Sequence, residues 1–522
     1  MSTATEFNIR DFGAAGDGNS LDSPAINAAI EAAAKAGGGT VRLPAGTYLS
    51  LSIRLASNIT LYLDAGAVLL AASPSDELGR YDLPEPNKWG DELHYQDFGH
   101  SHWRNSLIWG EDLENVTITG PGLIDGKGLL SHPEFTHGER PVGEANKAIG
   151  LKNCRNVTLS DFSMLKCGHF AVLATGVDNL VIHNLRIDTN RDGLDIDACR
   201  NVRISDCSIN SLNDDAIVLK ASYALGEKRA CEDITITNCL VSGFDPGSML
   251  DATYRTTVDK AVDRDGPTGR IKIGTESNGD FRNITISNCI FRRCRGLALE
   301  SVDGGVIEDV AITNITMVDV ANAPIFIRLG NRARGPEGTP VGAIRRVQIR
   351  NVSASGADGR FPIIIAGLPG HPVEDVVLDG IRVASDGGVG MAEVAAQPES
   401  LVNSFFLRGK EPGVRGPRDP FAVPEREKAY PEPSMFGLLP ASVLYARHAG
   451  DLKVSNLRYT LESPDDRPLV VLEDVDGILL ESCRSTPSEG DNIHLLEVRD
   501  FEIHRSNLAP DRRIGQAGVV DF

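Results

Sequence analysis

A short motif recurs along this chain and constrains its fold more than any other feature. Asn or Asp is followed by a β-branched or aliphatic residue and then by alternating residues, which is typical of a short β-strand. Copies begin at Asn115, Asn156, Asn201, Asp233, Asn283, Asp309 and Asp375. The tightest spacing is the one from Val157 to Leu180 and from Leu180 to Val202. A period in the twenties with short strands predicts a solenoid of stacked coils.

Two classes of solenoid have a period of this length. Leucine-rich repeats share it, but their frame of Leu and Asn with helices is missing here. Short β-runs with Asn at the corners fit a right-handed parallel β-helix instead, because stacked Asn side chains can satisfy buried backbone groups. We therefore expect an all-β fold built as one right-handed parallel β-helix.

The first coil of such a stack needs a cover, since its open end is an exposed strand edge. Residues 22–36 predict a capping helix, with Ser23 as N-cap, Pro24 at the first helical position and a Gly run at 37–39 as the stop. A chain of 522 residues usually has several domains, but a repeat array can reach that length as one unit. We expect a single domain over 1–522 with the cap at about 1–40.

Gly, Pro and charged residues interrupt the repeat at about 381–445. Loops of this length inside a compact domain are usually functional or disordered, and the aromatic residues of this stretch favour an ordered flap over a cleft. Strand-like runs resume at Val454, so about 450–522 is expected to form terminal coils. Further insertions at 78–110 and 244–268 could close one end of a groove.

The formal net charge of −20 argues against nucleic acid or an anionic membrane as a partner. No apolar run approaches the ~20 residues of a membrane span. Residues 1–6 carry neither a basic head nor an apolar signal core, so we expect a cytoplasmic protein if the chain is full length, and a periplasmic or secreted one if a signal peptide was removed. The sequence leaves the oligomeric state open.

Nine cysteines are spread over the interior of the sequence, and several end a β-run, as Cys207 and Cys289 do. None forms a Cys-x-x-Cys pair, and no Cys and His grouping has zinc-finger spacing. We therefore predict buried, reduced thiols and no metal site.

Two acidic clusters carry the candidate chemistry. Asp192 lies in the run 190–195, and the adjacent pair Asp214 and Asp215 follows it, with Asp214 as far after Asp192 as Val202 is after Leu180. If the coils stack, a one-coil offset brings the clusters to about 4.8 Å, the spacing of neighbouring strands. Carboxylates that close cannot all stay ionised, so one should hold a proton near neutral pH, as glycoside hydrolysis requires. Asp195 and Asp197 are interpreted as turn-lining residues.

Several segments resemble known β-helix proteins. The opening at 7–18 and the coil at 117–128 are similar to pectin-active enzymes with the pectin-lyase-like solenoid. Together with Asn190-x-Asp192-Gly193-x-Asp195 and the Asp214-Asp215 pair, they resemble glycoside hydrolase family 28, the polygalacturonases and their relatives. The resemblance spans residues 7 to about 380. The opening is shared with lyases and phage proteins, whereas the paired Asp motifs are more specific.

The resemblance implies an inverting hydrolase that needs no cofactor. By motif position Asp214 resembles the general acid, with Asp192 and Asp215 activating water. Lys220 matches a family lysine and is either a partner of these carboxylates or a solvated surface residue. His169, one coil before Asp192, either lines the cleft or is a plain turn histidine. A set of aromatic residues in the early insertion could stack on sugars or pack internally: Trp89, His100, His102, Trp103 and Trp109.

The chain departs from the family at two later motifs. Gly269 stands where the family has the histidine of Gly-His-Gly, and Ala298 and Glu300 stand where it has an Arg and a Lys that bind the substrate carboxylate. Glu300 would repel a uronate. Nearby charged residues remain candidates for substrate binding along with Lys220, His169 and Glu300: Arg270, Lys272 and Glu276.

These departures favour a neutral sugar next to the scissile bond. We expect an exo-acting hydrolase that releases a sugar such as rhamnose from pectic oligosaccharides of the rhamnogalacturonan kind. A galacturonate-releasing exo-polygalacturonase is the nearest alternative. A β-helix lyase or epimerase would need a uronate, and a non-catalytic carbohydrate-binding protein would give the adjacent acids no task.

Overall fold

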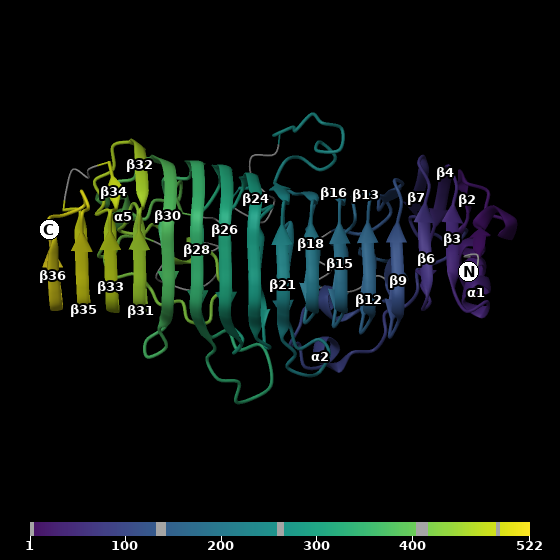
Figure 1. The fold of residues 1–522 in the computed structure, drawn as a ribbon, viewed down its shortest axis with the longest axis horizontal. Helices are drawn as coiled ribbons and strands as arrows, with labels where there is room; N and C mark the ends of the chain where they lie inside the picture. The colour runs from purple at the N-terminus through teal and green to yellow at the C-terminus, as the bar shows by residue number, and fades with distance from the viewer. Residues whose placement is uncertain (1–4, 132–141, 258–265, 403–415, 487–490) are drawn as a thin grey trace. The chain divides into compact units, whose positions relative to one another are not determined.

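A computed structural model describes residues 5–131, 142–257, 266–402, 416–486 and 491–522. The chain divides into two compact units, Met1–Val258 and Asp259–Phe522, here called unit 1 and unit 2. Strands and helices of each unit are labelled in Figure 1. Whether the whole chain is one domain stays a prediction.

Unit 1 is built from short parallel strands, most of which pair with the third strand after them, so that three stacks form. The strands are β1 (Glu6–Asn8), β2 (Asp17–Leu21), β3 (Gly39–Leu43), β4 (Gly46–Ser50), β5 (Ile53–Arg54), β6 (Ile59–Leu63), β7 (Ala67–Ala71), β8 (Ser106–Glu111), β9 (Glu114–Thr119), β10 (Leu123–Asp125), β11 (Lys147–Lys152), β12 (Arg155–Ser160), β13 (Ser163–Leu165), β14 (Phe170–Thr175), β15 (Asp178–His183), β16 (Arg186–Thr189), β17 (Asp192–Asp197), β18 (Arg200–Ser205), β19 (Ser208–Ser211), β20 (Ile217–Ala221), β21 (Cys231–Thr237) and β22 (Leu240–Ser242). Between them lie η1 (Ile9–Phe12), α1 (Ser23–Lys35), α2 (Lys88–Asp91) and α3 (Phe98–Ser101).

The repeat seen in the sequence sets the register of unit 1. Val157 of β12 lies opposite Leu180 of β15, and Leu180 lies opposite Val202 of β18, so one aliphatic column fills the core. Side chains alternate along each strand, which buries every second residue and turns the others outward. The coil length predicted from the spacing of these three residues is confirmed.

Asparagines at one corner form a ladder of hydrogen bonds. Asn115, Asn156, Asn179 and Asn201 each donate from the side-chain amide to the asparagine one coil earlier. All four have φ between 53° and 56°, a left-handed conformation that Asn tolerates better than most residues. The expected stacking of corner Asn side chains is confirmed.

The capping helix α1 lies where the sequence placed it and buries an apolar face. Its N-cap, however, is Asp22 and not Ser23, which is the first helical residue. The Asp22 carboxylate accepts hydrogen bonds from the backbone N–H groups of Ala15 and Gly16, and the Ser23 hydroxyl accepts one from Leu51 N–H. The predicted cap was one residue out because these two side chains bond to the neighbouring coil and not to the helix.

Unit 2 continues the same architecture with longer strands. They are β23 (Ile271–Ser277), β24 (Phe281–Cys294), β25 (Leu297–Ser301), β26 (Val306–Val320), β27 (Ile325–Leu329), β28 (Ala343–Ala357), β29 (Ile363–Ala366), β30 (Val373–Gly387), β31 (Leu444–Ser455), β32 (Arg458–Ser463), β33 (Val470–Glu481), β34 (Arg484–Ser485), β35 (Ile493–His504) and β36 (Arg512–Asp521). All pairings found among the described strands of unit 2 are parallel except that of β35 with β36, which is antiparallel. The stretch expected as an insertion at 381–445 contains the end of β30, then α5 (Met391–Ala396) and η2 (Pro433–Phe436), and the start of β31.

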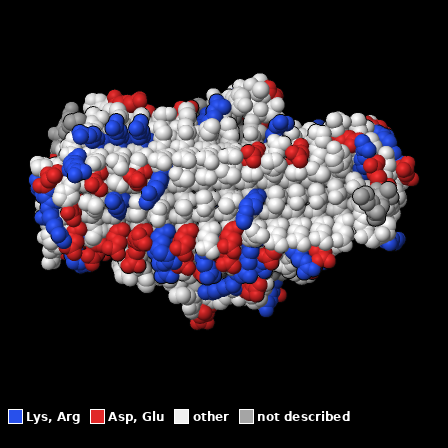
Figure 2. All heavy atoms as spheres, viewed as in Figure 1, with Lys and Arg blue, Asp and Glu red and all other residues white. Residues whose placement is uncertain are grey.

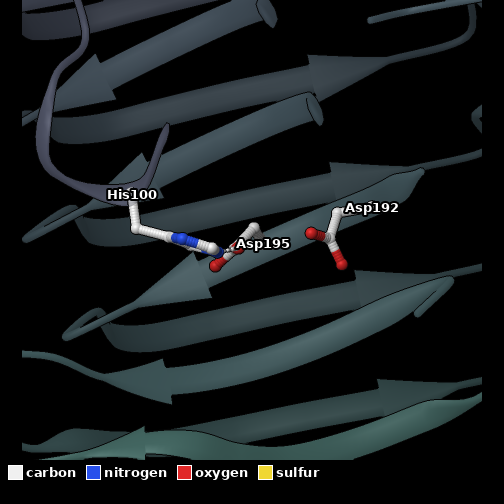
Figure 3. A group of neighbouring side chains, drawn as sticks. All are labelled: His100, Asp192 and Asp195. Atoms are coloured by element: carbon white, nitrogen blue, oxygen red, sulfur yellow. Dashed lines mark ion pairs between the residues drawn. The ribbon is translucent and has the colours of Figure 1, made fainter. Parts of the chain in front are cut away.

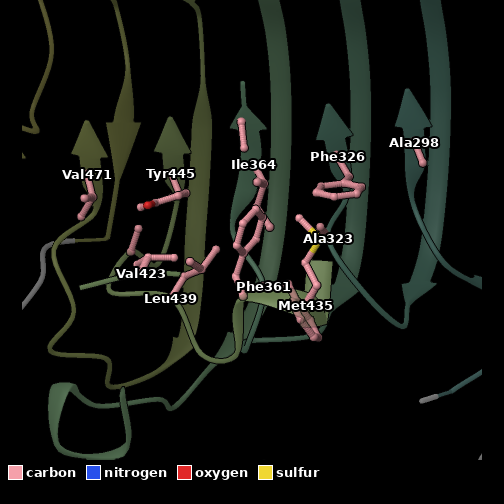
Figure 4. Packing of buried hydrophobic residues seen from close by; sticks show 13 residues of the cluster. Ala298, Ala323, Phe326, Phe361, Ile364, Val423, Met435, Leu439, Tyr445 and Val471 are labelled. Carbon is pink, nitrogen blue, oxygen red and sulfur yellow. The ribbon is translucent and has the colours of Figure 1, made fainter. Parts of the chain in front are cut away.

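Part of that stretch packs onto the strands of unit 2. Val423, Met435 and Leu439 join a buried cluster with Phe326 of β27 and Ile364 of β29 (Figure 4). Burial of this apolar area fixes the described part of the segment to the coils beneath it.

The fold class expected from the sequence, an all-β right-handed parallel β-helix with an N-terminal capping helix, is confirmed. All nine cysteines are buried and unbonded, as predicted. A search of the described residues finds no helix long and apolar enough to cross a membrane.

The asparagine ladder gives a test of stability. Asn179→Ala removes two amide hydrogen bonds and places Ala at a positive φ, so the free energy of unfolding should fall by about 1–3 kcal/mol. Asn179→Gly keeps the backbone conformation and should cost less. Urea denaturation measures both, with Val181→Ala as a control on the exposed face of the same strand. Equal losses for the Ala and Gly variants would contradict the role of the left-handed backbone.

Candidate active site

The two acidic clusters of unit 1 meet because β17 and β20 are neighbours in one stack. Leu194 lies opposite Ile217, and the Gly193 N–H donates to the Asp215 carbonyl oxygen at 3.0 Å. The sequence separation between facing residues of these two strands is therefore one residue longer than the separation of Asp192 and Asp214. It places Asp192 beside Asp215 and Arg191 beside Asp214, whereas a coil shorter by one residue would have aligned Asp192 with Asp214.

Arg191 holds one carboxylate of the pair. Its guanidinium lies 2.7 Å from Asp214 Oδ2, and both side chains are largely buried. A charge-assisted contact of this kind favours the ionised carboxylate. The register of the coil thus supplies Asp214 with a cation that the motif alone did not reveal.

Asp192 is the carboxyl group that the surroundings favour as protonated. Burial raises its pKa well above the usual range, and the negative charge of Asp214 raises it further, while Lys220 opposes the shift. Oxygen atoms of Asp192 and Asp214 lie within 4.8 Å of each other. These surroundings favour a proton on Asp192, beside the carboxylate that Arg191 contacts.

Asp195 lies at the centre of a second set of contacts (Figure 3). It is fully buried, with its Oδ2 atom 2.8 Å from Lys220 Nζ and 3.4 Å from His100 Nε2. Lys220 Nζ is also hydrogen-bonded to His100 Nε2. Since an ammonium group only donates, His100 Nε2 is the acceptor of this bond.

These contacts test what the sequence predicted for Lys220, Asp195 and Asp197. Lys220 is a buried partner of a carboxylate and not a solvated surface residue. Asp195 and Asp197 belong to strand β17 and not to a turn, so their assignment as turn-lining residues was wrong. Asp197 accepts hydrogen bonds from the Ser222 backbone and hydroxyl, and burial raises its pKa to about 6.

His100 reaches the site from a segment far away in the sequence. It belongs to α3, and Asn87 fixes this region by donating to the carbonyl oxygens of Ser101 and Ala224 at 2.9 and 2.8 Å. The ring of Trp89 packs against Tyr223 beside it. No local pattern marks His100, because its partner Lys220 lies 120 residues further along the chain.

His169 adds a second imidazole. Its Nε2 atom lies 3.9 Å from Asp192 Oδ2, and its ring packs against Phe170 with centroids 4.5 Å apart. Burial, aided by the charge of Arg191, lowers the pKa of His169 well below its usual value, so the ring is neutral. In the described part of the chain, Nδ1 of both His100 and His169 is buried without a hydrogen-bond partner.

Among the residues that the structure describes, two sets of side chains could in principle hold a metal ion. One is His100, Asp192 and Asp195, and the other is His169, Asp192 and Asp214, each with ligand atoms within 4.8 Å. The cations Lys220 and Arg191 already lie beside Asp195 and Asp214, and their charges oppose a divalent ion at either set. The geometry fits a carboxylate cluster neutralised by side chains.

The remaining predicted residues form their own buried group in unit 2. Arg270 lies 3.5 Å from Glu300 and 2.9 Å from Glu432, while Thr275 donates to Glu300 at 3.0 Å. Ala298 of β25 stands in register with Lys272 of β23.

The other two candidates of unit 2 also have partners. Lys272 Nζ lies 6.0 Å from the ring centroid of Tyr430, and Glu276 lies 3.6 Å from Arg332. The predicted substrate-binding residues of this stretch are therefore engaged with each other and with neighbouring side chains of unit 2.

Comparisons with known proteins agree with this picture. A sequence profile of the "Glycosyl hydrolases family 28" matches residues 90–262, and one described as "Rhamnogalacturonase A/epimerase, pectate lyase-like" matches residues 6–83. A probable polygalacturonase of Vitis vinifera is 32% identical over 395 residues, which cover 72% of this chain and 73% of that protein.

Solved structures share the fold. An exopolygalacturonase from Thermotoga maritima superposes with a TM-score of 0.54 at 22% identity, over 74% of this chain and 88% of that one. The family 28 exopolygalacturonase of Yersinia enterocolitica gives 0.59 at 19% identity, over 94% and 78%.

The family profile and the grapevine relative show that the class of protein is a glycoside hydrolase. The identity and coverage of the grapevine relative place the chain more narrowly, and it belongs to glycosyl hydrolase family 28.

The raised pKa of Asp192 predicts a pH-dependent stability. The folded protein binds a proton at Asp192 that the unfolded chain has released above a pH of about 3.9, so the stability from this group is present at low pH and is lost as the pH rises. Wild type should therefore lose stability between pH 4 and pH 8 that Asp192→Asn does not lose. The change in the free energy of unfolding over this range should differ between the two proteins by more than about 1 kcal/mol. Thermal unfolding across this range measures the difference.

The exposed corner variant Asp112→Asn serves as the control and should show no such trend. An Asp192→Asn protein whose stability follows the wild-type pH profile would contradict the buried, protonated state.

Proposed function

We propose that this enzyme is an inverting, exo-acting hydrolase that releases a neutral sugar, such as rhamnose, from pectin-derived oligosaccharides. The observation that carries the proposal is the cluster of three carboxyl groups, Asp192, Asp214 and Asp215, with one proton favoured at Asp192. A proton donor next to ionised carboxylates is the arrangement that hydrolysis of a glycosidic bond requires.

In the proposed mechanism Asp214 protonates the leaving oxygen, as its motif position implies. The proton comes from Asp192, whose carboxyl oxygen lies within 4.8 Å of Asp214. Asp192, once ionised, and Asp215 then activate the water that attacks the anomeric carbon from the opposite side. Arg191 stabilises the ionised form of Asp214 at the start and end of the cycle.

The preference for a neutral sugar rests on two positions in unit 2. Ala298 and Glu300 stand where the family motif has the Arg and Lys that bind a uronate. Arg270, the neighbouring cation, is paired with Glu300 and Glu432. A carboxylate bound there would meet a like charge at Glu300, which is costly in a buried position.

Release of galacturonate is the second candidate. The relatives described above are named as polygalacturonases, and Lys272, beside Tyr430, supplies a buried cation in β23. This alternative requires Lys272 to bind the substrate carboxylate in place of the missing Arg and Lys.

Exo action is proposed from the early insertion. The segment with α2 and α3 is anchored to Ala224, just after β20, and brings His100 onto Asp195 and Lys220. A polar cover over the end of the acid-bearing strands limits how far a sugar chain can extend on that side.

Substitution of Asp214 tests its role as the general acid. Asp214→Asn should lower kcat by about 10²- to 10⁴-fold, the usual contribution of general acid catalysis, and leave the fold intact. Asp206→Asn, an exposed corner residue of the same unit, is the matched control. Wild-type turnover in the Asp214 variant would rule out the assignment.

The stereochemical outcome tests the role of water. Attack by water opposite Asp214 inverts the anomeric configuration, whereas a covalent intermediate would retain it. Proton NMR in the first minutes of reaction shows which anomer appears first. An initial product with the starting configuration would exclude the proposed mechanism.

The identity of the released sugar tests the neutral-sugar preference. The rate on rhamnogalacturonan oligosaccharides with a terminal rhamnose should exceed the rate on homogalacturonan, because Glu300 accepts hydrogen bonds from hydroxyls and repels carboxylates. Product analysis by chromatography gives both rates. Efficient galacturonate release that Lys272→Ala abolishes would establish the second candidate instead.

A further inference from the structure

Three arginines stand in one column on the surface of unit 2. Arg382 of β30 is in register with Arg458 of β32, and Arg458 is in register with Arg484 of β34. Neighbouring strands lie about 4.8 Å apart, so the guanidinium groups can recur at about that interval. All three side chains are exposed, and Figure 2 shows a row of basic side chains over this part of unit 2, at the upper left.

Packing does not account for this arginine column. Some exposed arginines have carboxylate partners, as Arg200 has in Glu232 and Arg499 has in Asp476. Among the residues that the structure describes, no ion pair is found for the three arginines of the column. Like charges directly opposite each other in a sheet are destabilising, so the column costs stability in the free protein.

The arginine column lines a groove with a volume of about 810 Å³. The rest of its wall carries mainly amides and hydroxyls, and no carboxylate is among the lining residues: Asn314, Ile315, Thr316, Asn351, Val352, Ser353, Gly380, Asn456 and Ser482. Thr316 and Ser353 continue the same column, because Thr316 is in register with Ser353 and Ser353 with Arg382. The groove therefore follows the stacking direction across five strands of unit 2.

We propose that this groove binds an anionic polysaccharide in which every sugar carries a carboxylate, that is, a polyuronate strand. Arginine pairs with carboxylates through two parallel hydrogen bonds, and the amides and hydroxyls beside it suit sugar hydroxyls. A polyuronate carries one carboxylate on each pyranose ring, so a bound strand brings several carboxylates along the groove. The arginine column offers several cations along the same direction.

The proposed binding site and the acid cluster of unit 1 have different functions. It serves to hold the enzyme on the acidic regions of pectin, and it does not depend on which sugar the acid cluster releases. Each exposed ion pair contributes modestly, so the three together should contribute on the order of tenfold in affinity. Since the groove is open to solvent, salt should screen most of this contribution.

The test compares two triple variants on affinity gels that contain immobilised polygalacturonate, where retarded migration reports binding. Calorimetry with an oligogalacturonate then gives Kd, in an Asp214→Asn background to prevent hydrolysis. The column variant carries Arg382→Gln, Arg458→Gln and Arg484→Gln. Its control carries the same change of net charge at arginines that already have carboxylate partners: Arg200→Gln, Arg346→Gln and Arg499→Gln.

The column variant should bind on the order of tenfold more weakly than its parent and lose its salt dependence, while the control keeps both. Replacing the three arginines by lysine should restore only part of the affinity, because lysine keeps the charge and loses the bidentate geometry. In active enzyme, the column variant should raise KM for long pectic substrates and leave kcat on short ones unchanged.

Three results would overturn the proposal. One is equal affinity of the column variant and its parent for polygalacturonate. Another is an equal loss in the control, which would indicate a general effect of charge. The third is binding of single-stranded RNA or anionic lipid vesicles by the wild-type protein as tightly as polygalacturonate. If Asp214→Asn still cleaves substrate, the catalytic assignment fails while the gel comparison stands.

Discussion

The register between neighbouring coils is the constraint on which the rest of unit 1 depends. Each coil fixes the next through parallel backbone hydrogen bonds and a buried aliphatic column, so a shift of one residue would move every outward side chain. Between β17 and β20 this register pairs Arg191 with Asp214 and Asp192 with Asp215. The protonation pattern of the acid cluster is thus set by the length of one coil.

Charge balance then shapes the site. Five buried carboxyl groups lie between Asp192 and Asp215 and would repel one another strongly if all were ionised and unpaired. Arg191 lies beside Asp214, Lys220 lies beside Asp195, and the surroundings of Asp192 favour its protonated form. Burial keeps the nearby His169 ring neutral, because it lowers the pKa of that imidazole. The two cations and the proton reduce the negative charge of the cluster before a sugar binds, and the charge that is left suits a reaction whose transition state becomes cationic.

Much of this could be predicted from the sequence, because the relevant signals are local or repeat at a fixed period. The coil length, the corner asparagines, the buried cysteines and the meeting of the Asp clusters all follow from such patterns. The contact of His100 with Lys220 could not be predicted, since it joins two segments through an insertion with no repeat. The arginine column was hidden for the same reason: a long segment separates Arg382 from Arg458, and only the strand pairing aligns them.

The strand β36 has a consequence for how copies of the molecule meet. It runs antiparallel to β35, whereas the other pairings among the described strands of unit 2 are parallel. A second copy that tried to extend the stack would need to continue a parallel ladder, and it meets a reversed edge that carries charged residues such as Arg512 and Arg513. The parallel strands of a solenoid could in principle pair with those of further copies, end to end. The antiparallel strand β36 disfavours such pairing at this edge of unit 2.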